Sequence, residues 1–346
     1  MLRFLTAGES HGKALTAILE GMPAGLRIDK KYINNELKRR QQGIGRGKRM
    51  SIEQDEADII AGLKNNISLG SPIALLVKNK DTSIESLPPV FCPRPGHADL
   101  AGLLKYGFKD GRNVLERASA RETAARVAVG AVCKILLSEF KISVSSKVIS
   151  IASAEVIEEM EEKVREAQVA KDTVGGIFKV VVDNVPAGLG SYVQYDRRLD
   201  ASLAQAVISI PGVKGLEFGL GFGYASSFGS EVHDPIIYSK SKGYGRTSNN
   251  AGGIEGGVTN GQEIVIQAVM KPIATLLNPL ASVDIRNKKV ARGSVERSDI
   301  CAVESAAVVA EAVVAFALAQ ALLEKFGSDS LLDIKESFKR YLKRIS

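Results

Sequence analysis

Apolar residues recur at helical spacing in three long parts of the chain. In residues 154–167 an apolar stripe lies opposite a face rich in Glu and Lys, which predicts an amphipathic surface helix. A second helix is predicted after Ser119, because Ser119 and Glu122 have the S-x-x-E spacing of a capping box. A third, rich in Ala and Val, follows Asp299 and is apolar on most of its surface, so we expect it to be buried.

Shorter apolar runs predict β-strands at residues 72–77, 177–182 and 264–270. Strands and helices follow one another without regular βαβ alternation, which favours an α+β fold over a doubly wound parallel sheet. A chain of 346 residues suits one large domain or two ordinary ones. No low-complexity linker marks a boundary, so we treat residues 1–346 as a single domain.

The composition, with 45% hydrophobic and 25% charged residues, is that of a soluble globular protein and excludes a disordered or fibrous chain. Three widely spaced cysteines without a CxxC pattern fit neither a disulfide framework nor a zinc site, so we expect no metal and a reducing, cytoplasmic location. The first residues, MLRFLTAGESHG, lack the apolar core of an export signal. The longest apolar stretch, residues 312–323, is shorter than the about 20 residues that span a bilayer, so no membrane association is expected.

The net charge of +7 is concentrated in residues 27–49, which hold nine basic and two acidic residues and a short predicted helix from Asp29 to Gly43. Such a run is usually a solvated helix face or a nucleic-acid arm, although the low aromatic content argues against stacking on single strands. The segment matches neither a P-loop nor a dinucleotide-binding glycine motif. Three interleaved glycines favour a loop whose arginines wrap one small anion. These arginines are Arg39, Arg40, Arg46 and Arg49.

Three further features could carry chemistry. His11 in GESHG and His97 in RPGHAD lie in loops framed by glycine or proline, where a histidine can act as an acid or base or can simply bond loop carbonyls. The start of the capped helix could bind phosphate, with Arg117 and Arg121 beside it, or could be an ordinary cap. Asp299 precedes a helix, where aspartate is usually an N-cap.

Nine motifs occur in a fixed order between residues 8 and 301: GESHG, RR-x-x-G-x-x-R, RPGHAD, ASARETAARVA, VPAGLG, SIPGVKGLEFG, NAGGIEGGVTNG, KPIAT and RSDIC. Together they closely resemble the chorismate synthase family. The resemblance implies a lyase of the shikimate pathway, which leads to the aromatic amino acids. It would eliminate phosphate from 5-enolpyruvylshikimate 3-phosphate in a 1,4-anti reaction that gives chorismate, with reduced FMN and no net redox change. The resemblance also implies a β-α-β sandwich, with helices packed between antiparallel sheets, and a homotetramer.

Roles for individual residues follow from the same resemblance. His11 would give a proton to the departing phosphate, His97 would protonate the reduced flavin, and Asp299 would help to remove the C6 proton. Arg40, Arg46 and Arg49 match substrate-binding arginines. The first two also match positions that bind NADP, so NADPH is a candidate reductant. Flavin-contacting positions are matched by Arg117, Ala118, Ser119, Pro211, Gly212, Gly256, Lys271, Pro272, Ile273, Ala274, Thr275 and Arg297.

The chain departs from the usual family pattern at three places. It has LERASARE where members often have GGRSSARE, Asn250 where histidine is usual, and AVES after the cysteine of RSDIC where AVP is common. Ala118 still offers backbone groups to a flavin, so we expect activity to survive. The anionic substrate and flavin would balance the basic segment, which then no longer argues for a nucleic-acid partner.

Overall fold

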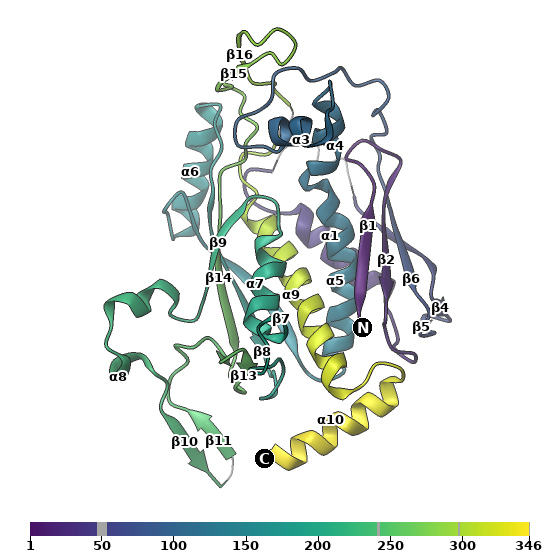
Figure 1. Cartoon of the computed structure of the whole chain (residues 1–346), viewed down its shortest axis with the longest axis vertical. Helices are drawn as coiled ribbons and strands as arrows, with labels where there is room; N and C mark the ends of the chain where they lie inside the picture. The colour runs from purple at the N-terminus through teal and green to yellow at the C-terminus, as the bar shows by residue number, and fades with distance from the viewer. Residues whose placement is uncertain (47–53, 241–242, 297, 346) are drawn as a thin grey trace.

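The computed structural model describes residues 1–46, 54–240, 243–296 and 298–345, and its two main sheets enclose a layer of helices (Figure 1). Every pairing within both sheets is antiparallel. The first sheet contains, in spatial order, β1 (Arg3–Ala7), β2 (Ala14–Glu20), β6 (Ile73–Lys78) and β3 (Ala57–Ala61). The second contains β7 (Ser143–Ile151), β8 (Gly176–Asp183), β14 (Ile264–Met270) and β9 (Val213–Phe218).

The helix layer between the sheets is built from α1 (Lys30–Gln41), α5 (Thr123–Ser138), α7 (Leu199–Ile208) and α9 (Val303–Phe326). Helix α5 contacts β2 and β6, α9 contacts β7 and β8, and the two helices pack on each other. In β14 every second residue is buried, so one face of the second sheet joins the core. This β-α-β sandwich confirms the expected α+β fold with helices between antiparallel sheets.

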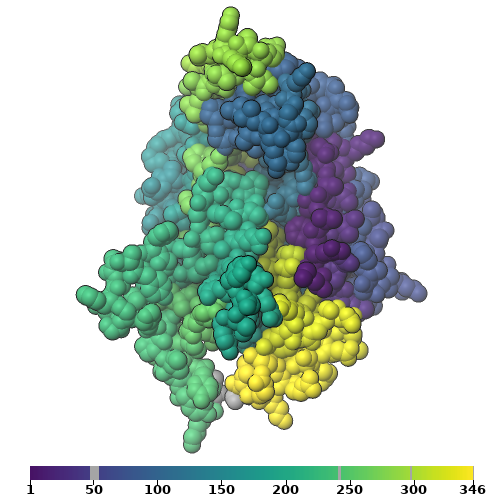
Figure 2. All heavy atoms as spheres, viewed as in Figure 1, coloured from purple at the N-terminus to yellow at the C-terminus, as the bar shows by residue number. Residues whose placement is uncertain are grey.

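Smaller elements surround the sandwich. The helices are α3 (Asp99–Tyr106), α4 (Arg112–Ala118), α6 (Ile157–Val169), α8 (Gly229–Val232) and α10 (Leu331–Ile345), with 3-10 turns η1 (Ala120–Glu122), η2 (Tyr195–Arg197) and η3 (Gly221–Ser226). Short strands pair as β4 (Leu63–Lys64) with β5 (Ile67–Ser68), β10 (Ile236–Ser239) with β11 (Gly243–Arg246), β12 (Ile254–Glu255) with β13 (Val258–Thr259), and β15 (Ala281–Val283) with β16 (Val290–Arg292). Figure 2 shows the β10–β11 arm projecting at one end of the molecule and the β15–β16 hairpin at the other.

Helix α9 lies in the core, as its apolar composition predicts. By length and composition it could cross a membrane, but 83% of its most apolar window is buried inside the protein, as in the core helix of a soluble protein. A glycine lets α5 approach it closely, since a Cβ added at Gly130 would lie 2.3 Å from the Cβ of Ala312. The strands expected from the three short apolar runs are confirmed as β6, β8 and β14, each within one residue at either end.

The start of α5 differs from the predicted capping box. The Ser119 hydroxyl accepts a hydrogen bond from the backbone N–H of Arg121 at 3.3 Å and caps η1, and α5 begins only after that turn. Glu122 does not complete the box, because its carboxylate accepts from the Thr6 hydroxyl at 2.7 Å and from Arg126 at 2.9 Å. A tertiary contact with β1 therefore replaces the local bond that the sequence pattern predicts.

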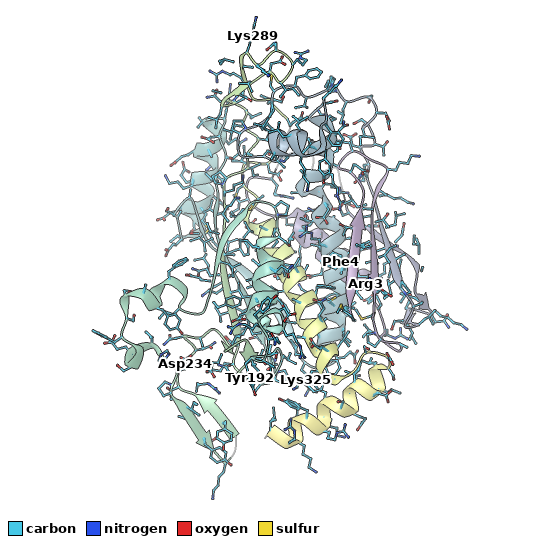
Figure 3. The ribbon with its side chains drawn as sticks, viewed as in Figure 1. Arg3, Phe4, Tyr192, Asp234, Lys289 and Lys325 are labelled. Carbon is cyan, nitrogen blue, oxygen red and sulfur yellow. The ribbon has the colours of Figure 1, made fainter. Side chains whose placement is uncertain are left out.

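Asn250, one of the three departures noted in the sequence, ties together two segments at the base of the β10–β11 arm. Its backbone N–H donates to Oδ1 of Asp234 at 2.8 Å, and its side-chain amide donates to the carbonyl of Val232 at 2.9 Å. Figure 3 labels Asp234 at the base of this arm. Both bonds join the loop after β11 to the segment before β10 and so give Asn250 a structural part.

Candidate active site

A pocket of about 290 Å³ opens at the end of the helix layer where α5 and α9 begin and α1 ends. Its walls come from the turn between β1 and β2, the loop before α3, the end of α4 and the loops after α7 and β14. These segments are distant in sequence and meet only in the fold. The expected site residues that line it are His11, Arg40, Arg46, His97, Ala118, Ser119, Pro211, Gly212, residues 271–275 and Asp299.

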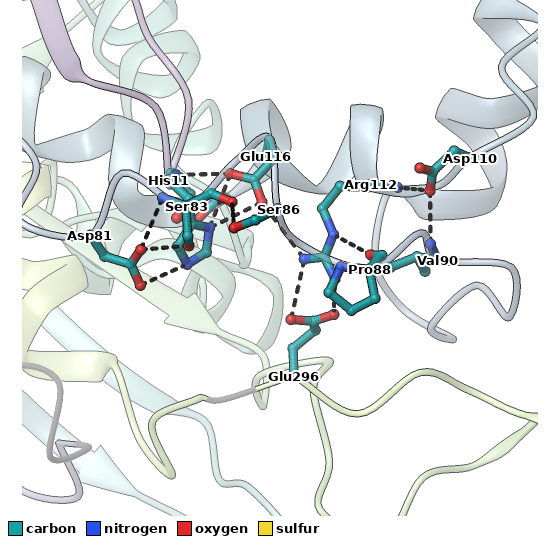
Figure 4. Close-up of polar contacts among 12 residues, drawn as sticks. His11, Asp81, Ser83, Ser86, Pro88, Val90, Asp110, Arg112, Glu116 and Glu296 are labelled. Carbon is teal, nitrogen blue, oxygen red and sulfur yellow. Dashed lines mark hydrogen bonds and ion pairs between the residues drawn. The ribbon is translucent and has the colours of Figure 1, made fainter.

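His11 lies in the turn between β1 and β2 and is held by a buried carboxylate (Figure 4). Its backbone N–H donates to Oε2 of Glu116 at 2.8 Å, and its ring atom Nδ1 lies 3.0 Å from Oε1 of the same residue. Nε2 lies 4.0 Å from Oδ2 of Asp81. Burial alone would raise the pKa of Glu116, but hydrogen bonds from His11 and the charge of Arg112 hold that pKa below its ordinary value. Glu116 is therefore ionised at neutral pH.

His97, in the loop before α3, has the same kind of partner. Its Nδ1 lies 2.5 Å from Oδ1 of Asp99, a side chain with no exposed surface. Arg94 donates to both oxygens of Asp99, at 2.8 and 3.0 Å, and to the hydroxyl of Thr275 at 2.7 Å. Burial opposes ionisation of Asp99, but hydrogen bonds from His97 and Arg94 outweigh it and hold the pKa of Asp99 well below its usual range. Arg94 thus connects the His97 pair to the loop after β14.

Arg40 and Arg121 share one buried carboxylate, Asp55, beside the pocket. Nη2 of Arg40 donates to Asp55 at 2.8 Å, and Nη1 of Arg121 donates to both of its oxygens at 2.7 Å. Burial lowers the pKa of Arg40, and the charge of Asp55 only partly opposes this effect. Nε of Arg40 is buried and has no hydrogen-bond acceptor among the described residues. Two guanidinium groups on one carboxylate leave one positive charge for an anionic ligand.

Asp299 is paired with Arg46 and does not cap a helix. Nη1 of Arg46 donates to Oδ2 of Asp299 at 2.7 Å. Because the N-cap of α9 is Ala302, the interpretation of Asp299 as a helix cap is wrong. Arg39 points elsewhere, since it donates to both oxygens of Glu311 at 2.7 Å inside the helix layer. The expectation that Arg39 joins an anion-wrapping loop is therefore wrong as well.

The loop after β14 and the turn after α7 form one wall of the pocket. The backbone N–H of Lys271 donates to the carbonyl of Gly212 at 2.9 Å, and the Lys271 ammonium donates to the carbonyl of Gly96. Gly212 has a φ of +88°, and an added Cβ would lie 3.0 Å from Cε of Met270, so this turn favours glycine. Burial and the nearby charge of Lys214 lower the pKa of Lys271. The wall offers backbone groups and an ammonium to a ligand.

Four expected site residues are not among those that line the described pocket. Arg117 donates to two backbone carbonyls near the end of β1, at 2.9 and 3.0 Å. Gly256 lies in the turn between β12 and β13. Arg49 and Arg297 lie outside the described residues. Their assignment to the site stays a prediction.

Four residues that the sequence did not single out help to build the site, namely Asp55, Arg94, Asp99 and Glu116, and so does Arg121. Arg94 and Asp99 flank His97 within RPGHAD, so this motif contained a signal for both. Arg121 was suggested only as an anion-binding side chain at a helix start. Asp55 and Glu116 carry no local signal, because the groups that they bind come from distant segments.

The described part of the pocket lining is cationic. Histidine aside, it contains five basic side chains and two carboxylates. Asp55 and Asp99, which bind three of these arginines, reduce the net charge to +1. Such a lining suits ligands with phosphate or carboxylate groups, and a flavin phosphate is one of these. The two histidines and Asp299 add groups that can give or accept protons in the same space. The arrangement is therefore suited to acid–base chemistry on a multiply charged anion.

Comparison with known proteins gives one consistent result. The family model for chorismate synthase matches residues 2–323. The chorismate synthase of Caldanaerobacter subterraneus subsp. tengcongensis is 54% identical over 344 residues, which cover 99% of this chain and 98% of that relative. The Aquifex aeolicus enzyme is 50% identical over 391 aligned positions, with 99% and 98% coverage. A crystal structure of chorismate synthase matches with a TM-score of 0.83 at 43% identity and covers 99% of this chain and 98% of that chain. The chain belongs to the chorismate synthase family.

Proposed function

We propose that the pocket eliminates phosphate from 5-enolpyruvylshikimate 3-phosphate to give chorismate, the reaction of the family to which the chain belongs. The C6–H bond breaks and its electron pair forms a ring double bond. The existing double bond shifts toward C3, and phosphate leaves with the electron pair of the C3–O bond, so no net redox change occurs. The observation that carries this proposal is the cationic lining that contains His11, His97 and Asp299 in one pocket.

The substrate is held by arginines in this proposal. Arg40 and Arg46 bind its phosphate and carboxylates, and Arg49 joins them. The contacts that Arg40 makes with Asp55 and Arg46 makes with Asp299 support such a role, because they hold both guanidinium groups in place before a ligand arrives. Fixed cations of this kind stabilise negative charge as it gathers on a departing phosphate.

Three side chains handle protons in the proposed reaction. His11 gives a proton to the departing phosphate, which lowers the charge of the leaving group. Asp299, oriented by Arg46, helps to remove the C6 proton. His97 protonates the reduced flavin. The placement of both histidine rings against buried carboxylates supports these roles, because proton transfer needs a ring held in one direction.

Reduced FMN supplies electron density that helps the phosphate to leave and is not consumed. Ala118, Ser119, Pro211, Gly212 and residues 271–275 would hold it, and their backbone groups and the Lys271 ammonium at the pocket wall support this assignment. Arg117, Gly256 and Arg297 are assigned as further contacts by the family resemblance alone. Arg40 and Arg46 also match NADP-binding positions, so NADPH is the candidate reductant.

The absorbance of reduced FMN, measured without oxygen as substrate is added, tests the function. We expect a spectral change with the unmodified chain, and no change with active substrate would refute the proposal. His11→Ala and His97→Ala should still change the spectrum but lose turnover, and full turnover by both would refute their acid–base roles. His233→Ala is the matched control, because His233 is exposed and does not line the pocket, so turnover should be unchanged.

The source of reduced flavin has a separate test. Aerobic turnover with only NADPH, FMN and substrate would show that the chain reduces its own flavin. Turnover that appears only when a separate flavin reductase is added would show that it depends on an outside source. Arg46→Ala should weaken NADPH binding if the match to NADP-binding positions is correct, and unchanged NADPH binding would contradict that match.

We further propose that residues 1–346 form one domain that works as a cytoplasmic homotetramer. A single hydrophobic core cluster that runs from Leu2 to Ile334 supports the one-domain assignment. Free thiols at all three cysteines suit a reducing compartment. Exposed apolar side chains on and beside the β10–β11 arm support assembly. These are Phe222, Phe228, Ile236, Ile237, Tyr238 and Tyr244. Light scattering should give about four times the chain mass, and a monomer mass would disprove the assembly.

A further inference from the structure

Both pocket histidines contact a buried carboxylate through the same ring nitrogen. Nδ1 of His11 lies 3.0 and 3.1 Å from the two oxygens of Glu116, and Nδ1 of His97 lies 2.5 Å from Oδ1 of Asp99. Figure 4 shows the contact between His11 and Glu116. The first pair joins residues 105 positions apart, whereas the second joins a residue of the loop before α3 to the first residue of that helix, two positions away. The same arrangement therefore arises twice, from unrelated local structures, in one pocket.

The proton in each pair must lie on Nδ1. Glu116 and Asp99 are ionised at neutral pH, because the hydrogen bonds that they accept hold both pKa values below the ordinary range. An ionised carboxylate can only accept hydrogen bonds, so Nδ1 at these distances has to donate. Among the described residues, two other charged groups face the rings. Asp81 lies 4.0 Å from Nε2 of His11, farther than Glu116 lies from Nδ1. Nη2 of Arg94 lies 3.0 Å from Nδ1 of His97, but it already donates to Oδ1 of Asp99, which is nearer to Nδ1 than Arg94 is. If Nδ1 carried no proton, its lone pair would face a carboxylate oxygen, and neither buried acceptor would have a donor in this contact.

We propose that Glu116 and Asp99 are positioning residues, which keep a proton on Nδ1 of His11 and His97 so that Nε2 is the ring nitrogen that exchanges protons with a ligand in the pocket. Turning either ring over would break its bond to the carboxylate, so the same contact also fixes the direction of the ring. The effect on turnover rests on the proposed function, whereas the position of the proton does not.

An arginine connects each pair to the pocket wall. Arg112 lies 3.7 Å from Glu116 and donates to Glu296 at 2.8 Å (Figure 4), and Glu296 lines the pocket. Arg94 bridges Asp99 and Thr275 in the same way, and Thr275 also lines the pocket. Each carboxylate thus lies beside an arginine, whose positive charge keeps it ionised and in place.

Replacing each carboxylate by its amide should invert the position of the proton. In Glu116→Gln, the backbone N–H of His11 still needs the acceptor that Oε2 now provides at 2.8 Å. The amide oxygen takes that place, so the NH2 group faces Nδ1 from the position of Oε1, 3.0 Å away. Only the neutral amide oxygen, 3.1 Å from Nδ1, can still accept from it, so the balance shifts toward the ring form with its proton on Nε2. In Asp99→Asn, the backbone N–H and Nε of Arg94 hold the amide oxygen on the Oδ2 side, so the NH2 group lies on the Oδ1 side and faces Nδ1. Nη2 of Arg94, which loses its acceptor at Oδ1, lies 3.0 Å from Nδ1 and can donate to the bare nitrogen instead.

Nitrogen-15 spectra of labelled histidine side chains in the full chain test the proposal directly. The sequence contains three histidines, so each ring can be assigned by substitution. In the unmodified chain, Nδ1 of His11 and His97 should stay protonated as pH rises, and Nε2 should be the nitrogen that loses its proton. Loss of the proton from Nδ1 of either ring would overturn the proposal, even if the amide variants did not fold.

The amide variants add a matched comparison. Glu116→Gln should move the proton on His11 alone and Asp99→Asn on His97 alone, so each variant is the control for the other. Both should lower kcat by about 10²-fold or more, while KM for the substrate stays near its unmodified value. An inverted proton with unchanged kcat would overturn the positioning role. Absence of elimination in the unmodified chain would refute the proposed function and leave the spectral result intact.

Discussion

Replacing Asp55 by asparagine should lower the free energy of unfolding by about 3 kcal/mol or more. Asp55 accepts two hydrogen bonds of 2.7 Å from Arg121 and one of 2.8 Å from Arg40. Its side chain is 2% exposed and those of Arg40 and Arg121 are 5% and 7% exposed, so water cannot replace the lost charge. Removing one partner from a buried ion pair costs about 3–5 kcal/mol. Asparagine keeps the shape and one acceptor, so we expect the low end of this range.

Urea denaturation followed by far-ultraviolet circular dichroism measures this change, because the chain has no tryptophan to report unfolding by fluorescence. The matched control is Asp58→Asn. Asp58 pairs with Lys30 at 2.8 Å, but the two side chains are 44% and 46% exposed, so the loss should cost at most about 1 kcal/mol. Equal losses in the two variants would refute the reasoning that burial, and not ion pairing as such, sets the cost.

The Asp55 substitution should also change how the pocket binds anions. Without this carboxylate, the guanidinium groups of Arg40 and Arg121 keep more of their charge for a ligand. Inorganic phosphate should therefore raise the unfolding midpoint of Asp55→Asn more than that of the unmodified chain. Asp58→Asn should respond as the unmodified chain does. Equal stabilisation of all three proteins would show that these arginines do not face the anion site.

Three further substitutions test the packing and charges of the helix layer. Gly130→Ala should lower the free energy of unfolding by about 1–3 kcal/mol, because the added Cβ would lie 2.3 Å from that of Ala312, and an unchanged urea midpoint would contradict the close approach of α5 and α9. Burial disfavours ionised Glu311, but hydrogen bonds from Arg39 and other donors hold its pKa below the ordinary value. The contribution of Glu311 to the free energy of unfolding is therefore complete above the pKa of an unfolded glutamate, about 4.3, and is lost as the pH falls below that value. Glu311→Gln should flatten the acid limb of the stability–pH curve, and an unchanged limb would count against this. Burial and nearby carboxylates raise the pKa of Tyr32 to about 12, and the pKa of Tyr224 is raised too, so Tyr32→Phe should remove one of the tyrosines that ionise late in an ultraviolet titration.

Elements with strong local periodicity could be predicted from the sequence, whereas the pairing of strands could not. β14 coincides with the apolar run at residues 264–270, and α9 follows Asp299 as expected. The order β7-β8-β14-β9 pairs β14 with β8 and β9, which come much earlier in the chain, and no local pattern specifies such partners. The sandwich was therefore expected only from the resemblance to a family.

Some residues of the site could likewise be predicted from the sequence, and others could not. His11 and His97 could be predicted as candidates because they lie in loops framed by glycine or proline. Glu116 could not, since it lies on α4, 105 residues from His11, and resembles any other helical glutamate until the fold brings the two together. The predicted cap at Glu122 failed for a related reason, because its partner on β1, Thr6, is 116 residues away in sequence. Carboxylates that are buried by tertiary contacts thus have no local signature.

The basic side chains of residues 27–49 have different partners, because neighbouring residues on a helix point in different directions. Arg39 and Arg40 are consecutive on α1, yet Arg39 pairs with Glu311 inside the helix layer and Arg40 pairs with Asp55 beside the pocket. A nucleic-acid arm needs its cations free to neutralise a row of phosphates, whereas these two are held by carboxylates from other parts of the chain. The positive charge left at the pocket is concentrated in a small volume, so it matches one compact anion that carries a phosphate and carboxylates, and not an extended polyanion.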